Sequence, residues 1–153
     1  MSAPDGKRRL PVIKETPEGE EPPPEERPGS QWVWASAIIT VLLWTLVSGG
    51  SNAILQRAGV ESVGILVGVS VGSLFVAALV GGLATGRFGL KAERKHATYG
   101  TVAAAAFGWV LSISAGLNAA PIPFWFAVLA VLGGLAWGGG VLGYRLGKRL
   151  RPA

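Results

Sequence analysis

The sequence contains no cysteine and only one histidine, His96. Without cysteine the chain forms no disulfide and offers no thiolate for catalysis or for zinc and iron–sulfur ligation. Nine carboxylates and one imidazole leave few groups for a metal site or for acid–base chemistry. A phosphate-cradling loop with a Gly-rich run ending in Lys-Ser or Lys-Thr is also missing. We therefore expect neither an enzyme nor a metal or cofactor site.

Charge is missing from the middle of four long apolar stretches, at about residues 32–53, 63–86, 98–117 and 122–146. Each exceeds the roughly 18 residues that distinguish a membrane span from a buried soluble helix. About twenty helical residues, rising 1.5 Å each, cover the roughly 30 Å hydrocarbon layer. The sequence therefore predicts an all-α fold: a polytopic membrane protein in which residues 32–148 form a four-transmembrane-helix bundle.

Large apolar side chains are scarce at the N-terminus. Residues 1–31 hold six Glu between Glu15 and Glu26 and five Pro between Pro17 and Pro28. Such a segment cannot bury enough apolar surface to offset its ordering entropy, so we expect a disordered, acidic, Pro-rich tail. The tail either stays in solvent, folds over basic groups of the same chain or recruits a soluble partner. Residues 149–153 are expected to be a basic C-terminus.

The distribution of cations predicts the orientation of the bundle. If the four spans alternate, thirteen of the fourteen Lys and Arg residues lie on one side, and only Arg57 lies on the other. Short loops rich in Lys and Arg stay in the cytoplasm. We therefore expect an inner-membrane protein with both termini cytoplasmic.

The same cations explain the formal charge of +5 without nucleic acid, which we do not expect as a partner. Near a bilayer they attract anionic lipid headgroups. The residues expected to face headgroups are Arg87, Lys91, Arg94, Lys95, Arg145, Lys148 and Arg149. His96, in the same basic stretch, is expected to be a solvated loop residue.

Glycine, by contrast, is abundant, with 23 residues, many of them at four-residue spacing. Side chains four apart lie on one helix face, and a face of small residues lets two backbones approach closely in lipid. The predicted packing rows are Gly64, Gly68 and Gly72; Gly100, Ala104, Gly108, Ser112 and Gly116; and Gly139, Gly143 and Gly147. These rows pack the helices of one subunit together, dock onto a second copy or another membrane subunit, or line a pore.

Around the second loop the sequence reads Gly-Gly-Leu-Ala-Thr-Gly-Arg at 81–87, then a basic stretch, then His-Ala-Thr-Tyr-Gly at 96–100. This pattern resembles uncharacterised small glycine-rich four-helix bacterial membrane proteins, in which a Gly-x-x-x-Gly-Arg helix end precedes a short basic loop. The resemblance covers about forty residues around this loop and implies the four-helix topology, with no known activity. The overall character of the sequence predicts a bacterial source.

Two function classes remain. The first is a non-enzymatic scaffold or accessory subunit that acts through glycine-face helix packing, in contact with the lipid bilayer. The second is a small oligomeric channel or transporter. Channels and transporters usually carry ionisable residues inside the membrane, and their absence here favours the first class. Trp44, Trp109 and Trp137 lie deep in the predicted spans, where they either fill space opposite glycines or line a site for a hydrophobic ligand.

Overall fold

A computed structural model describes residues 28–116 and 121–151. Its four helices are α1 (Gln31–Arg57), α2 (Val63–Phe88), α3 (Arg94–Gly116) and α4 (Ile122–Arg149). All four are long and apolar enough to cross a membrane. The predicted all-α, four-helix class is therefore confirmed for the described residues, and the fold is that of a multi-pass membrane protein. Residues 1–27, which include most of the predicted tail, lie outside the described part.

The helices extend beyond the apolar stretches. Helix α1 continues to Arg57, α2 to Phe88 and α4 to Arg149, and α3 begins at Arg94. Polar and charged residues end an apolar run, but most of them remain good helix formers, so the helices continue toward the headgroup region. The longest, α4 with 28 residues, measures about 42 Å at 1.5 Å per residue.

Local backbone chemistry accounts for the end of α1 and the start of α4. Helix α1 ends in a Schellman motif: Gly59 has φ of 78°, and the N–H groups of Gly59 and Val60 donate to the carbonyls of Gln56 and Leu55, both at 3.0 Å. Glycine occupies this left-handed position without strain. Pro121 precedes α4, where the free N–H groups of the first turn make proline harmless.

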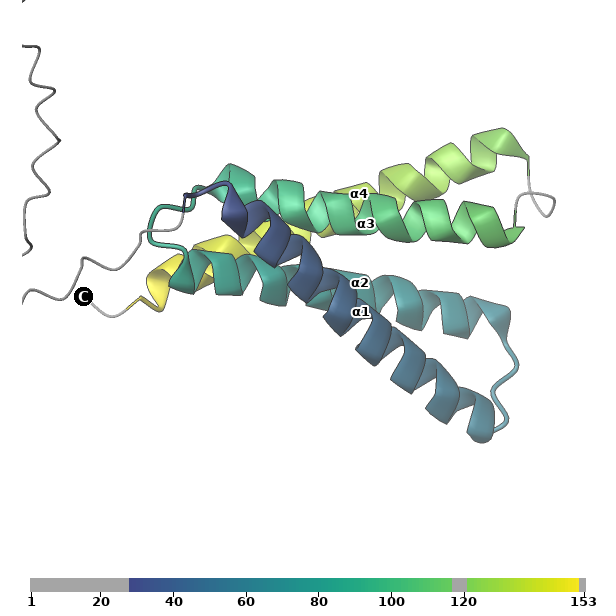
Figure 1. Cartoon of the computed structure of the whole chain (residues 1–153). Helices are drawn as coiled ribbons and strands as arrows, with labels where there is room; N and C mark the ends of the chain where they lie inside the picture. Colours follow the sequence, from purple (N-terminus) through teal and green to yellow (C-terminus); the bar gives the residue numbers. More distant parts are fainter. Residues whose placement is uncertain (1–27, 117–120, 152–153) are drawn as a thin grey trace, which may run out of the picture.

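The helices form two antiparallel hairpins, α1–α2 and α3–α4 (Figure 1). Helix α2 packs most extensively on α4, while α1 contacts α2 and α3 and does not contact α4. All four gather at the end that carries the α2–α3 loop and the end of α4, which we call the closed end. At the opposite, open end the two hairpins spread apart (Figure 1).

Small residues dominate the interior. The core cluster consists of Leu74, Ala78, Ala105, Leu132 and Ala136, with Trp44 and Trp109 packed against it. Large aliphatic side chains such as Leu42, Leu46 and Val63 are instead exposed on the outside of the bundle. This distribution suits a lipid environment, in which helix association depends on close packing of small residues.

Candidate functional site

Glycines join α2 to α4 in the closed half of the bundle. A methyl group at Gly82 would overlap the Gly140 carbonyl, and one at Gly86 would overlap the carbonyl of Tyr144. Glycines of α4 meet α2 in the same way: Gly143 faces the Leu79 carbonyl and Gly147 faces the Leu83 carbonyl. A methyl group at Gly139 would lie 2.8 Å from the carbonyl oxygen of Phe75. The two backbones approach so closely that no side chain fits between them.

The predicted row of α3 faces α1. Gly100 abuts the Val33 carbonyl, Ala104 is buried, and Gly108 lies against the Trp44 ring. The expectation that Trp44 fills space opposite a glycine thus has a structural counterpart. Ser112 lies one turn further along, at the open half, and donates to the Gly108 carbonyl at 2.8 Å. Gly116 ends the helix, and its surroundings are not described.

The glycine row of α2, which is Gly64, Gly68 and Gly72, has open surroundings. Apart from the adjacent backbone of α2 itself, no atom lies within 4 Å of a methyl placed at Gly68 or Gly72, and at Gly64 only the hydroxyl of Ser62 does, at 3.9 Å. All three glycines are exposed. The structure therefore encloses Gly100, Ala104, Gly108, Gly139, Gly143 and Gly147 within the subunit, whereas the row of α2 faces outward and Ser112 is exposed.

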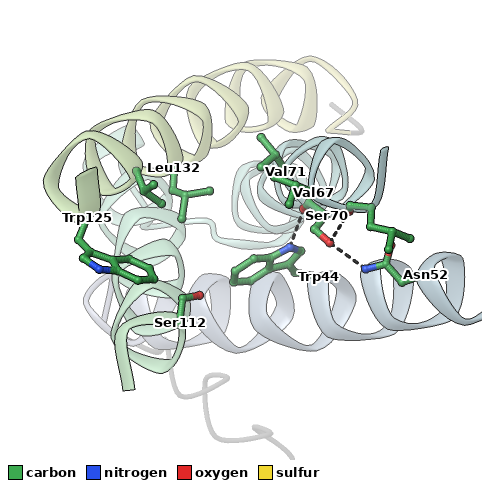
Figure 2. A pocket seen from close by; sticks show the side chains of 10 residues that line it. Trp44, Asn52, Val67, Ser70, Val71, Ser112, Trp125 and Leu132 are labelled. Carbon is green, nitrogen blue, oxygen red and sulfur yellow. Dashed lines mark hydrogen bonds between the residues drawn. The ribbon is translucent and has the colours of Figure 1, made fainter. Parts of the chain in front are cut away.

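A cavity of about 360 Å³ lies between the two hairpins in the open half. All four helices contribute to its wall: Trp44 and Asn52 of α1, Ser70 of α2, Ser112 of α3 and Trp125 of α4. The two indoles lie on either side of it, with the Ser112 hydroxyl between them (Figure 2). Leucine and valine side chains form the rest of the wall. The cavity thus suits an uncharged, largely apolar occupant.

Ser70 is the centre of a polar cluster beside this cavity (Figure 2). Its hydroxyl accepts from the Ser48 hydroxyl and the Asn52 amide, both at 2.9 Å, and donates to the Leu66 carbonyl at 3.0 Å. The Trp44 N–H donates to the Ser70 carbonyl at 2.8 Å. These bonds hold the α1–α2 hairpin together at membrane depth, where an unsatisfied polar group is costly. The Asn52 Oδ1 atom is buried with no hydrogen-bond partner.

Tyr144 and Arg151 make long-range hydrogen bonds at the closed end. The Tyr144 hydroxyl donates to the Ala92 carbonyl at 2.9 Å. The Arg151 guanidinium donates to the carbonyls of Gly86 at 2.7 Å and Gly89 at 2.5 Å. A cation at these carbonyls complements the negative end of the α2 dipole. Arg151 thus caps α2 instead of facing headgroups.

The prediction that His96 is a solvated loop residue is wrong. It lies in the first turn of α3 and is half-buried. Its Nδ1 atom accepts from the Glu93 N–H at 2.9 Å, while its backbone N–H donates to the Glu93 carbonyl at 3.0 Å. The first of these bonds is the one that a side chain makes in a capping box, with imidazole in place of the usual carboxylate. The structural reason for the difference is that α3 begins four residues before its apolar run.

The predicted headgroup-facing cations do not form one uniform rim. Arg94, Arg145, Lys148 and Arg149 line, together with Tyr144, a pocket of about 440 Å³ that we call the basic pocket. Lys95 lies 3.0 Å from the Glu93 carboxylate, and its hydrogen bond lowers the pKa of that carboxyl below its ordinary value. Arg87 lies over the ring of Phe88, 5.6 Å from its centroid. Lys91 is exposed on the α2–α3 loop.

Within residues 28–116 and 121–151, no three His, Asp or Glu side chains gather in a way that would hold a metal ion. No family model, curated protein or solved structure matches the chain. The candidate sites are therefore the glycine row of α2, the cavity between the hairpins and the basic pocket.

Proposed function

We propose that the protein is a non-enzymatic inner-membrane scaffold or accessory subunit that binds a transmembrane helix on the glycine row of α2. The supporting observation is that this row continues the face by which α2 binds α4. Gly68 and Gly82 are fourteen residues apart, as are Gly72 and Gly86, and fourteen residues are close to four helical turns. Gly82 and Gly86 contact α4, whereas the row itself has no helix against it because α4 has diverged.

The chemistry of the row favours a helix over lipid tails. Glycines expose backbone atoms, and a second helix makes more dispersion contacts with such a groove than mobile acyl chains do. The same face already binds a helix in the closed half, so a partner helix meets a surface of matching shape. A second copy of the chain and a helix of a different subunit both fit this description.

The orientation of the bundle is part of the proposal. The end of α2, the α2–α3 loop, the start of α3 and the end of α4 carry nearly all of the cations outside the N-terminal segment, and all of them lie at the closed end. The positive-inside rule therefore favours a cytoplasmic closed end and cytoplasmic termini. The glycine row of α2 then lies in the outer half of the membrane.

The test is Gly68→Leu, matched with Gly50→Leu. Both glycines are exposed and a methyl at either meets no other helix within 4 Å, so we expect the subunit to accommodate leucine at either position. We expect the wild type and Gly50→Leu to migrate in mild detergent as an assembly larger than one chain, and Gly68→Leu to migrate as a single chain. Affinity purification from native membranes then identifies any second component. A wild type that is monomeric and alone, or a Gly68→Leu protein with unchanged mass, would overturn the proposal.

The cavity between the hairpins supports a second candidate, a small transporter. The bundle is closed at one end by backbone contacts and open at the other around a largely apolar cavity that includes Asn52, Ser70 and Ser112, an arrangement that resembles one half of an alternating-access cycle. In that case the glycine row would receive the outer half of α4 when the bundle closes.

A cysteine pair tests this closure directly, because the chain has no cysteine of its own. Leu129 lies fourteen residues before Gly143, on the face of α4 that meets α2 in the closed half. If α4 closes onto the glycine row, we expect a disulfide between Gly68→Cys and Leu129→Cys. Its failure to form under oxidation would count against the transporter.

A further inference from the structure

The basic pocket gathers four positive charges at one place at the closed end. Arg145, Lys148 and Arg149 follow the i, i+3, i+4 spacing that places side chains on one face of α4, and Arg94 completes the pocket from the start of α3. All four are exposed, and the structure gives none of them an acidic partner among the described residues. Four like charges around one pocket of about 440 Å³ repel one another unless an anion lies between them.

Two ordinary explanations account for only part of this cluster. Cations in the last turn of α4 complement its dipole, but that dipole corresponds to about half a charge. The positive-inside rule requires cations at this end of the bundle, but it does not require them to gather in one pocket. Arg87 and Lys95 lie at the same end and outside the basic pocket. Arg94 moreover lies at the positive end of the α3 dipole, where an anion is favoured over a cation.

The surroundings of the pocket indicate a lipid. Leu142 and Leu146, next to Arg145 on α4, are 46% and 43% exposed and belong to the apolar span. The chain thus presents an apolar surface directly beside the cluster of charge. Basic pockets between transmembrane helices at the cytoplasmic surface are suited to headgroups with several phosphates.

From this geometry we infer that the basic pocket is a binding site for an anionic phospholipid whose headgroup carries two phosphates. Arg94 on one side and Arg145, Lys148 and Arg149 on the other bind the phosphates, and the acyl chains lie along Leu142 and Leu146. One phosphate leaves most of the charge unmatched, so a lipid with a single phosphate binds more weakly. The inference does not depend on the proposed assembly through the glycine row.

The test compares two double variants that lose the same charge. Arg145→Gln with Arg149→Gln removes two cations of the pocket, whereas Arg87→Gln with Lys95→Gln removes two cations outside it at the same end. The full-length protein in nanodiscs of a zwitterionic lipid is titrated with cardiolipin, and bound lipid is counted by native mass spectrometry. Each cation near an anionic lipid contributes about fivefold in affinity. We expect the pocket variant to lose at least ~10-fold and the control less than ~3-fold.

Two further probes identify the anion. We expect phosphatidylglycerol, which has one phosphate, to bind at least ~10-fold more weakly than cardiolipin, because it engages about two fewer charge contacts. Inorganic pyrophosphate has two phosphates and no acyl chains, and we expect no saturable binding. Circular dichroism and a single monodisperse peak establish that each variant is folded. Equal losses in the two double variants, equal binding of both lipids, or tight binding of pyrophosphate would each overturn the inference.

Discussion

Replacing Gly143 with alanine tests the central packing claim most directly. A methyl group there would overlap the Leu79 carbonyl oxygen and lie 2.8 Å from both the Leu79 carbonyl carbon and the Leu83 nitrogen. All three atoms belong to the backbone of α2, so no side-chain rotation relieves the overlap. Helices α2 and α4 must move apart along the contact that closes the bundle.

The expected magnitude follows from two opposing terms. Inserting a methyl into a well-packed interior costs about 1–3 kcal/mol, and a rigid backbone obstacle favours the upper end. Alanine gains about 1 kcal/mol over glycine inside a helix. The net destabilisation of Gly143→Ala is therefore about 2 kcal/mol. A methyl at Gly68 meets no other helix within 4 Å, so Gly68→Ala keeps only the helix gain and stabilises the subunit by up to about 1 kcal/mol.

The assay is reversible unfolding in mixed micelles with increasing dodecyl sulfate, followed by circular dichroism. Both substitutions exchange glycine for alanine within a transmembrane helix and share the same gain in helix propensity. The difference between their free energies of unfolding therefore isolates the cost of the overlap with α2. We expect Gly143→Ala to be less stable than Gly68→Ala by about 3 kcal/mol, which is the sum of the opposing effects. A difference below ~0.5 kcal/mol would show that the backbones do not approach as closely as the structure has them, and it would refute the reasoning.

Hydrogen bonds and an ion pair elsewhere in the chain lead to three further predictions. Arg151→Gln removes the cap on the Gly86 and Gly89 carbonyls, and we expect faster hydrogen exchange at the end of α2 with no change in the middle of α1. Ser70→Ala deprives Ser48 and Asn52 of their partner, and we expect a loss of about 1 kcal/mol in the same unfolding assay, against no loss for the exposed Thr45→Ala. Because its pKa is lowered, we expect Glu93 to stay ionised and bonded to Lys95 at neutral pH. The contact disappears only as the pH falls through the lowered pKa, which side-chain NMR titration measures, and a midpoint at or above the ordinary value would contradict the assignment.

The number and order of the helices were predictable because the physics is local. A long apolar run in lipid must satisfy its backbone internally, and a helix does so within the run itself. The ends were less predictable. The apolar run of α3 begins near Thr98, yet the helix begins at Arg94, since a cap formed by Glu93 and His96 satisfies its first turn.

The sites depend on contacts that sequence spacing does not contain. Ser70 and Asn52 are eighteen residues apart, and Arg151 and Gly86 are sixty-five apart, so each pairing exists only once the helices have packed. Spacing did identify the residues of the glycine rows. It did not distinguish Gly143, which touches α2, from Gly68, which touches no other helix, because both lie in the same kind of row.

The sizes of the side chains along one face of α4 explain why the two hairpins diverge. In the closed half the residues of α4 nearest α2 are Gly139, Gly143 and Gly147, and the distance between packed helices follows the size of the side chains between them. Seven and fourteen residues before Gly139, the same face carries Leu132 and Trp125, and both line the cavity. Helix α2 carries glycines in both halves of this face, Gly68 and Gly72 in the open half and Gly82 and Gly86 in the closed half, so it is α4 whose side chains become too large for close contact. The change from glycine to leucine and tryptophan along α4 therefore separates the helices, creates the cavity and leaves the glycine row of α2 without a helix against it.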